Sequence, residues 1–544
     1  MTGSISFATG FFEDASARRF GAQDMLGFAG LVAFSLVAFS LVTPVQAQSP
    51  SEAALRPAPG PASNVVQVLE ARGDSLWIGP NLALTTDGGT SFREAEARAL
   101  QSDDNVLFAV DVRPGLPGSS LVAAGLAFDA DGQSAAGGFL LSRDGGASFR
   151  FEPPALDAAQ DTTVSYGVST LRARPVVREA GSAPQDLATS ASGDTLWLAA
   201  GQAGIRYSTD DGSSWERVVL PPDTLSAIDP NTAYDFPLSA ATGSSGFFNH
   251  LGSSVLVDAS GTVWAGTAGG LNRSTPADRT DSGARAWQRF THTGTPTGLT
   301  GNNVVRITEQ QRPAAPNALW LVTWPVNTEP GQQQRFGVTT TTDQGRSFTQ
   351  TLVDERIFDL AFDGERVYAA GDNGLFVSED NGTSWTSTRR FALPSGAYHR
   401  PDAGVRAVAT TRNAVWVGTT DGLLRSTDGG LTWRLFRASA PLSSDAPGTR
   451  SVDTYAYPNP FTPSADRVVR IRYARDQPGT TRVRILDFAM QRVRTLRAAG
   501  DSPGEQELVW DGTDENGLRL PNGTYFYEVE TDQGSARGKI LLID

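Results

Sequence analysis

The eight residues Ser208 to Trp215, Ser-Thr-Asp-Asp-Gly-Ser-Ser-Trp, decide how this chain folds, because their pattern occurs six times. We call each copy an Asp turn, and the copies are residues 85–92, 142–149, 208–215, 341–348, 378–385 and 426–433. In a tight turn a short acidic side chain accepts hydrogen bonds from backbone N–H groups, and glycine supplies a positive φ. The closing Trp or Phe fixes the start of the next strand. The pattern therefore predicts a structural device that performs no chemistry.

A second pattern precedes each Asp turn: an alternating apolar strand, a step of small residues, and another strand. It is clearest in residues 74–89, 193–212, 364–382 and 413–430. The third and fourth Asp turns are separated by about two repeats, and residues 261–276 supply the missing unit, with an insertion before Trp287 in place of the turn. Seven units of four short strands over residues 64–437 predict an all-β fold, a seven-bladed β-propeller.

The turns resemble Asp-box repeats, also called BNR repeats, and residues 64–437 look like a propeller built from them. Residues 263–273 and 299–307 also resemble the repeat of two-component regulator propellers, a resemblance that extends to the fold only. Similar propellers occur in sialidases, xyloglucan hydrolases, sortilin-like receptors and a photosystem II assembly factor. The resemblance therefore implies a fold and selects no activity.

Composition narrows the classes of function. The 544 residues suffice for two or three domains, and a net charge of −14 without a basic patch argues against nucleic acid as a partner. The absence of cysteine excludes thiol catalysis, disulfides and thiolate metal sites. Only three histidines are present, His250, His292 and His399, so we expect no metal centre and no cofactor.

The N-terminal region predicts export. Residues 25–43 are apolar and uncharged, and small residues follow up to Ala47, which is typical of a secretory signal peptide within residues 1–47. An uncleaved anchor helix is the alternative, and Met25 is an alternative start. Residues 48–63, rich in Pro, Ala and Ser, are expected to form a leader.

The C-terminal region follows a different pattern. After a polar linker at residues 438–453, the strands of residues 454–544 alternate apolar residues with arginine, as in Val469 to Tyr473. One buried and one solvated face, with turn signals between about seven strands, predict an Ig-like β-sandwich.

Four marks in this region resemble the FlgD-like Ig module and the type IX secretion sorting domain: residues 457–461, 510–512, 523–527 and 539–543. The resemblance implies export through the outer membrane, release or surface attachment, and the outer-membrane secretion machinery as partner. Residues 488–490, Phe-Ala-Met, depart from the usual glycine-containing turn. The alternative is that residues 454–544 form an Ig-like spacer with no role in export.

Chain order predicts where a ligand binds. In four-stranded antiparallel blades the Asp turns lie on one face, and the blade links 152–185, 221–252 and 389–404 lie on the other, with connections 127–137 and 324–336. Loops on a rigid scaffold carry function disproportionately, so we expect the ligand on this loop face. The candidates are Tyr234, Phe236, Phe248, His250, Trp324, Arg335, Tyr398, His399, Arg400 and Asp402. Aromatic planes with arginine suit an extracellular glycan or a surface protein, unless they only fold the loops onto the disc.

Catalysis has less support. The Arg-Ile-Pro mark of sialidases is absent, and a glycoside hydrolase would need two carboxylates across a cleft. Loop-face carboxylates are available at Asp129, Asp131, Asp229, Asp235, Glu329 and Asp402, but no catalytic pair is identified. The aspartates of the Asp turns are assigned to structure: Asp87, Asp144, Asp210, Asp343, Asp380 and Asp428. Residues 128–133 lack the later ligands of a calcium loop.

The sequence thus predicts an exported or cell-surface binding protein with a ligand face on the propeller and a C-terminal domain for secretion or attachment. An extracellular glycoside hydrolase and an assembly or adhesion scaffold are the alternatives.

Overall fold

The computed structural model describes residues 54–543, except 59, 62, 96–99, 101–104, 114–119, 242–245, 281–282, 327–332, 395, 401–402, 439–453, 476 and 533. The described residues form two compact units, one up to residue 438 and the other from residue 454. The predicted signal peptide at 1–47, and most of the linker at 438–453, lie outside the described residues. Among the described residues, no helix has the length and apolarity needed to cross a membrane.

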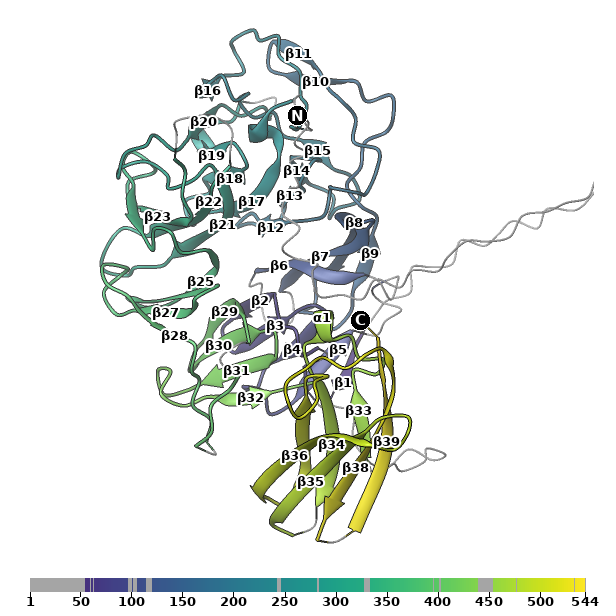
Figure 1. The fold of residues 1–544 in the computed structure, drawn as a ribbon. Coiled ribbons are helices and arrows are strands. Elements are labelled where there is room, and N and C mark those ends of the chain that lie inside the picture. Colours follow the sequence, from purple (N-terminus) through teal and green to yellow (C-terminus); the bar gives the residue numbers. More distant parts are fainter. Residues whose placement is uncertain are drawn as a thin grey trace, which may run out of the picture. The chain divides into compact units, whose positions relative to one another are not determined.

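The first unit is built from antiparallel sheets whose strands follow one another along the chain (Figure 1). Sheet 1 contains β1 (Leu55–Ala58), β2 (Leu69–Arg72), β3 (Ser75–Ile78), β4 (Ala83–Thr85) and β5 (Phe92–Ala95). Sheet 2 contains β6 (Val106–Arg113), β7 (Leu121–Ala130), β8 (Gln133–Ser142) and β9 (Arg150–Glu152). Sheet 3 contains β12 (Asp186–Thr189), β13 (Leu196–Ala199), β14 (Ile205–Ser208) and β15 (Glu216–Arg217).

The remaining sheets of this unit repeat the arrangement. Sheet 4 contains β16 (Ala227–Ile228), β17 (Gly252–Val257), β18 (Val263–Thr267), β19 (Gly270–Ser274) and β20 (Trp287–Phe290). Sheet 5 contains β21 (Asn303–Gln310), β22 (Ala318–Trp324), β23 (Gly337–Thr341) and β24 (Thr349–Thr351). Sheet 6 contains β25 (Ile357–Asp363), β26 (Arg366–Gly371), β27 (Gly374–Ser378) and β28 (Thr386–Thr388). Sheet 7 contains β29 (Val405–Thr411), β30 (Ala414–Thr419), β31 (Gly422–Ser426) and β32 (Arg434–Phe436).

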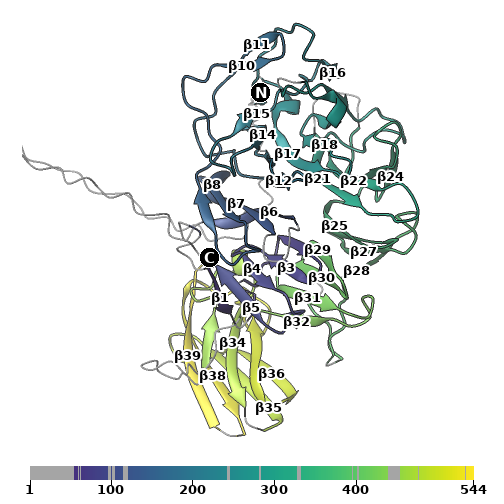
Figure 2. The same cartoon turned by 180° about the vertical axis from the view of Figure 1, so that it is seen from behind.

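These sheets close into a ring. The innermost strands β2, β6, β12, β17, β21, β25 and β29 each lie against the next one, and β29 lies against β2 (Figures 1 and 2). At the closure the Val66 N–H donates to the Thr419 carbonyl, and the Gly422 N–H donates to the Asn64 carbonyl. The prediction of an all-β propeller is confirmed.

A large aromatic side chain on the second main strand of most sheets fills the space between neighbours. These side chains are Trp77, Trp197, Trp264, Trp320, Tyr368 and Trp416, each at most 2% exposed. Trp416 of sheet 7, for example, shares a core cluster with Leu76 and Phe92 of sheet 1. Burial of such large rings contributes strongly to the adhesion between sheets.

Three segments differ from the expected loops. Residues 55–58, placed in the leader by the sequence, form β1 and pair with the outer strand β5. The connection at 127–137 is a continuation of β7 and β8 that pairs up to Ala130 and Gln133, and Asp131 and Gly132 turn the chain with positive φ. The link at 152–185 carries its own ribbon of β10 (Thr163–Tyr166) and β11 (Ser169–Arg172). Short 3-10 turns lie at Phe248–His250 and Pro276–Asp278.

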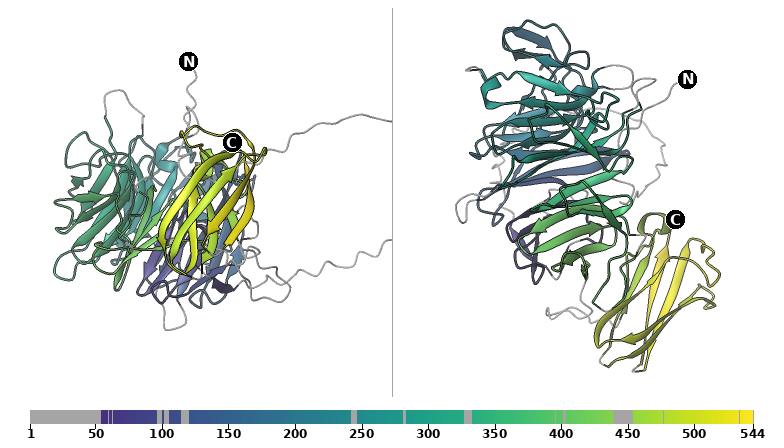
Figure 3. Two further views of the ribbon diagram at one scale, coloured as in Figure 1. Left: turned by 60° about the horizontal axis from the view of Figure 1, so that its bottom comes forward. Right: turned by 90° about the vertical axis from the view of Figure 1, so that its left-hand side faces the viewer.

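The second unit consists of two sheets (Figure 3). One contains β33 (Thr454–Tyr457), β34 (Val469–Arg475) and β37 (Gly504–Trp510), and the other contains β35 (Gly479–Leu486), β36 (Arg492–Asp501), β38 (Gly523–Thr531) and β39 (Gly534–Leu542). A single helical turn, α1 (Pro463–Asp466), precedes β34. Ile471, Val483, Trp510 and Tyr527 lie in one shared core, as an Ig-like sandwich requires. The predicted Ig-like unit is confirmed.

Candidate functional site

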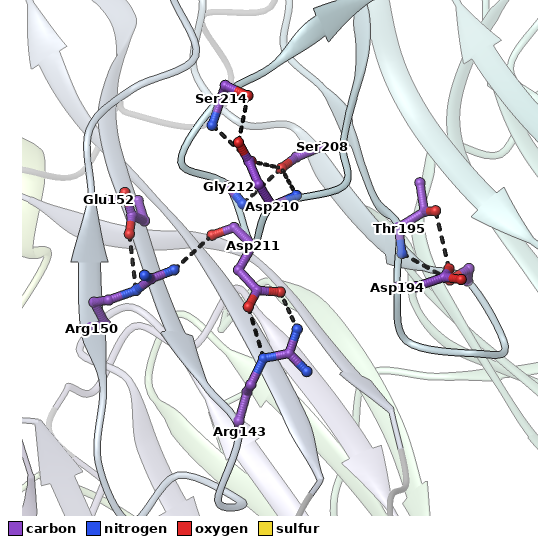
Figure 4. A network of polar contacts seen from close by, with 11 residues as sticks. Arg143, Arg150, Glu152, Asp194, Thr195, Ser208, Asp210, Asp211, Gly212 and Ser214 are labelled. Carbon is purple, nitrogen blue, oxygen red and sulfur yellow. Dashed lines mark hydrogen bonds and ion pairs between the residues drawn. The ribbon is translucent and has the colours of Figure 1, made fainter. Parts of the chain in front are cut away.

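The six Asp turns have one hydrogen-bond pattern. In the turn of sheet 3, the carboxylate of Asp210 accepts the backbone N–H and the hydroxyl of Ser214, and also the hydroxyl of Ser208. Ser208 in turn accepts the N–H of Gly212 (Figure 4). The same four bonds recur in the other five copies. Each carboxylate is therefore fully engaged in its own turn.

These bonds favour the charged form of the aspartate. Hydrogen bonds from the Ser347 hydroxyl and N–H lower the pKa of Asp343 to about 2. A general acid or base at neutral pH would need a pKa shifted in the opposite direction. The geometry fits a structural role for these side chains.

Each turn also contacts the preceding sheet. Two consecutive residues have positive φ, as Asp211 and Gly212 do at 58° and 77°. The guanidinium of Arg143 in sheet 2 forms an ion pair with Asp211, and Arg150 donates to the Asp211 carbonyl (Figure 4). The first turn makes the equivalent contact around the ring, because Arg425 of sheet 7 donates to the Gly88 carbonyl. The Asp turns thus join sheets as well as strands.

The first group of predicted ligand residues lies together near sheets 3 and 4. Tyr234 and Phe236 have ring centroids 5.9 Å apart, and Phe236 and His250 have centroids 6.3 Å apart. Phe248 is half-buried against the core, while Phe236 and His250 are buried. Phe236 and His250 thus pack under the links, while Tyr234 and Phe248 stay partly exposed.

His250 is engaged on both ring nitrogens. Its Nδ1 accepts the Ser239 N–H at 3.3 Å, so its Nε2–H donates to the Leu220 carbonyl at 3.1 Å. Burial lowers the pKa of His250, which keeps the imidazole neutral. This histidine ties together the start and the middle of the link at 221–252, and both of its ring nitrogens are occupied by these bonds.

The second group lies in sheet 5 and its surroundings. The Trp324 Nε1–H donates to the Ile357 carbonyl, and the guanidinium of Arg356 covers the Trp324 ring at 4.6 Å from its centroid. The Arg335 guanidinium forms an ion pair with Asp354. Trp324 therefore already has a cation on its face, where a sugar would need to stack.

The third group lies in the link between sheets 6 and 7. His399 is buried beside Phe391, while Tyr398 is 59% exposed and has Arg390 6.0 Å from its ring centroid. Arg400 is half-buried, and Asp402 lies outside the described residues. The three groups lie at three different parts of the ring, each packed against its own loop neighbours.

A hollow of about 680 Å³ lies where sheet 3 ends opposite its Asp turn. Gln133 of sheet 2 and four segments line it: residues 174–178 with 180, residues 202–205, residues 217–218 with 220, and residues 238–240 with His250. Its volume is within the range of small-molecule sites in proteins. Of the predicted ligand residues that the structure describes, His250 alone lines this hollow.

Backbone hydrogen bonds hold the walls of this hollow in place. The Arg174 N–H donates to the Leu238 carbonyl, and the Val218 N–H donates to the Ile205 carbonyl. The Gln202 N–H donates to the Gly181 carbonyl. Segments far apart in the sequence are thus fixed against one another, and the hollow is preformed.

The lining is cationic. Arg174, Arg178 and Arg217 line the hollow, and none of the described residues in its lining is an aspartate or a glutamate. A second hollow of about 470 Å³ shares Arg174 and Ser239 with it and is lined also by Arg172 and Phe247. In a chain with a net charge of −14, this is a local excess of positive charge.

Asp157, which is not one of the lining residues, orients Arg217 of the hollow. Asp157, whose side chain is 9% exposed, forms ion pairs with Arg206 and Arg217 and accepts the Val176 N–H. Burial lowers the pKa of Arg206, and Asp157 acts in the opposite direction. One buried carboxylate is thus shared by two guanidinium groups, so the net charge of these three side chains is positive.

A second charged cluster lies at the centre of the ring, where the inner strands meet. Arg306 of sheet 5 has its Nε 3.2 Å from Asp359 of sheet 6, its Nη1 3.5 Å from Asp186 of sheet 3 and its Nη2 3.8 Å from Glu70 of sheet 1. Asp111 of sheet 2 accepts the Thr189 hydroxyl nearby. We call these five charged residues the axial cluster: Glu70, Asp111, Asp186, Arg306 and Asp359.

Burial opposes the negative charge of this cluster. It raises the pKa of Glu70 to about 8 and that of Asp186 to about 6, although Arg306 lowers both. The carboxylates are tied to Arg306 and to backbone amides such as Val408 N–H, which donates to Asp359. Among the described residues, no group of three or more His, Cys, Asp or Glu side chains is placed to hold a metal ion.

Sequence reasoning did not find the hollow or the axial cluster. The hollow combines Gln133 with four other separate segments, so no local sequence pattern predicts it. The axial cluster has a signal, since Arg306 and Asp359 interrupt apolar first strands, in Val-Val-Arg-Ile and Ile-Phe-Asp-Leu. In a closed ring, a charged residue on an innermost strand can meet charged residues from the inner strands of other sheets, as Arg306 does.

Comparison with known proteins gives similar solved structures at low sequence identity and a family match within the second unit. A search of curated proteins finds no match. Among solved structures, the chain is similar to PorZ of Porphyromonas gingivalis, a bacterial surface component of the type IX secretion system, at 15% identity and a TM-score of 0.37. The likeness covers 88% of this chain and 66% of PorZ, so this chain spans just under two thirds of that protein.

Two other solved structures are similar to the chain at low sequence identity. The xyloglucanase of glycoside hydrolase family 74 from Xanthomonas campestris is 14% identical with a TM-score of 0.43, over 89% of this chain and 69% of that one. YCF48 from Cyanidioschyzon merolae is 16% identical with a TM-score of 0.34, over 68% of this chain and 98% of that one. Residues 465–535 match the FlgD Ig-like domain, and the second unit therefore contains a domain of that kind.

Proposed function

We propose that this chain is an exported or cell-surface binding protein whose propeller binds its ligand, a glycan or a protein segment, in the hollow of sheet 3. The proposal assigns the Asp turns to the Asp-box repeats and the ring to a seven-bladed propeller of that kind. The observation that carries it is the preformed hollow of about 680 Å³ on the side of the long links. Residues 454–544 are proposed to direct secretion or surface attachment, which the FlgD-like match supports.

Hydrolysis of a polysaccharide has less support at this site. Two carboxylates must face the scissile bond, and the described residues that line the hollow include none. The carboxylates of the axial cluster have raised pKa values, but Arg306 forms ion pairs with three of them. We therefore place binding ahead of catalysis.

Filling the hollow is expected to weaken ligand binding at least tenfold. Val177 lines the hollow and is 48% exposed, so Val177→Trp adds bulk over the opening with little cost to the core. We expect the wild-type chain to bind at least one member of an array of glycans and envelope proteins. The variant should bind it at least tenfold more weakly, which corresponds to about 1.4 kcal/mol.

The matched control is Leu431→Trp. Leu431 is 76% exposed in the Asp turn of sheet 7, on the face opposite the long links. This substitution adds the same ring and should leave binding unchanged. Equal binding by the wild-type chain and Val177→Trp would place the ligand elsewhere on the protein and contradict the proposal.

Removal of residues 454–544 is expected to stop delivery to the cell surface. The propeller has its own cores, so the shortened chain should fold and accumulate in the periplasm of the native host. Fractionation and surface proteolysis measure the location, and far-UV circular dichroism of the recovered propeller controls for folding. Surface delivery of the folded, shortened chain would exclude the export role.

A further inference from the structure

The charge and shape of the hollow specify a class of ligand. We infer that it binds an organic carboxylate: an acid group held by Arg178 and Arg217, attached to an apolar body that packs on the aliphatic wall. This inference rests on the proposed binding function and adds the chemistry of the ligand.

Arg178 is the first half of the acid subsite. Its side chain is exposed at the hollow, and among the described residues it forms no ion pair and no hydrogen bond. A guanidinium presents two parallel N–H donors that match the two oxygens of a carboxylate. Arg178 is thus a cation at a concave surface with its donors unused.

Arg217 is the second half, and it is already oriented. Its Nη2 is bonded to Asp157 and to the Arg174 carbonyl, which fixes the plane of the guanidinium. The bonds that the described residues make to Arg217 all end on Nη2, so Nε and Nη1 remain as donors. Because Asp157 is shared with the buried Arg206, it does not cancel the charge of both arginines.

The rest of the hollow is aliphatic. Val177, which is 48% exposed, and the half-buried Val218 supply its accessible apolar surface, and none of the described residues that line it is Trp, Tyr or Phe. A neutral sugar usually stacks on an aromatic plane, which this lining lacks. Burial of an aliphatic or ring-carbon body against these side chains contributes to affinity in proportion to the apolar area covered.

Three pairs of probes test the inference, each an acid with its uncharged counterpart: decanoate and decanamide, N-acetyl-leucine and N-acetyl-leucinamide, galacturonate and galactose. Titration calorimetry on the full chain measures each dissociation constant. We expect the acid of at least one pair to bind at least tenfold more tightly than its counterpart. The pair that binds identifies the source: a lipid-like acid, a peptide C-terminus or an acidic sugar.

Variants connect that preference to the site. Arg178→Gln should reduce acid binding at least tenfold and leave the neutral counterpart unchanged, while Arg178→Lys should retain part of the preference. Arg346→Gln is the matched control, because it removes an exposed arginine from the Asp turn of sheet 5. Arg178→Lys thus tests whether a positive charge at this position is sufficient, and Arg346→Gln tests whether loss of a positive charge elsewhere has the same effect.

The outcomes separate this inference from the proposed function. If acids and counterparts bind alike, or if Arg178→Gln keeps the full preference, the carboxylate inference is overturned. The proposed function still stands in that case if Val177→Trp weakens the binding of an array ligand at least tenfold. If no probe binds, the carboxylate inference is overturned, and the array decides the proposed function independently.

Discussion

Replacing Arg306 with methionine is expected to lower the free energy of unfolding of the propeller by about 3 kcal/mol at pH 8. Arg306 is the shared cation of Glu70, Asp186 and Asp359, which come from three different sheets. Its loss leaves buried carboxylates facing one another without compensation, and this costs more than the packing that methionine retains. Urea unfolding followed by tryptophan fluorescence measures the change.

The destabilisation should depend on pH in a defined direction. Burial raises the folded-state pKa of Glu70 from its ordinary value of 4.5 to about 8 and that of Asp186 from 3.8 to about 6. A group with a raised folded-state pKa gives stability that is complete below its unfolded-state pKa and is lost as the pH rises through the folded-state value. In the wild-type chain this loss therefore extends from about pH 4 to pH 8.

In Arg306→Met the loss of the cation raises these pKa values further, because Arg306 lowers both of them in the wild-type chain. The difference between the two chains should be small at pH 5, where protonation relieves the repulsion, and largest near pH 9. The triple variant Arg306→Met, Glu70→Gln, Asp359→Asn should recover most of the stability, since it removes two of the uncompensated charges. A loss that is equal at pH 5 and pH 9 would show that Arg306 acts by packing alone, and this account of the cluster would then be wrong.

The sequence predicted the propeller because the Asp turns are local structures with a fixed spacing. Even the unit without a turn was placed correctly: β18 and β19 fall within residues 261–276, and β20 begins at Trp287 after the insertion. Alternation of arginine with apolar residues predicted the Ig-like unit in the same way, because Ile471 and Tyr473 face its core. Where a short-range pattern decides the structure, sequence reasoning succeeded.

Long-range geometry was not accessible to that reasoning. The aromatic residues of the loop face could point outward or into the disc, and Phe236, His250 and His399 are buried. The hollow depends on bonds such as that between Arg174 and Leu238, which no repeat encodes. Residues 55–58 read as a leader, yet the exposed edge of β5 pairs with them as β1. In each case the structure of the segment depends on a contact with residues that lie far away in the sequence.

Gly146→Ala is expected to destabilise the propeller by about 3 kcal/mol, from left-handed strain and overpacking together. Gly146 has φ of 87°, and an added Cβ would lie 2.2 Å from the Trp77 ring of the preceding sheet. The equivalent glycines of four other Asp turns also face a side chain of the preceding sheet: Gly89 on Phe436, Gly212 on Leu141, Gly345 on Phe290 and Gly382 on Trp320. The substitution should therefore separate sheets 1 and 2, which urea unfolding with fluorescence detection will report.

The neighbouring glycine provides the matched control. Gly145 has φ of 71°, and an added Cβ there meets no atom within 4 Å. Gly145→Ala should cost only the strain of the left-handed conformation, about 1 kcal/mol. The difference between the two variants therefore isolates the contact between the Asp turn and Trp77. Equal losses would mean that the glycine of the turn is required for backbone conformation only, and the Asp turns would then join strands within a sheet without fastening one sheet to the next.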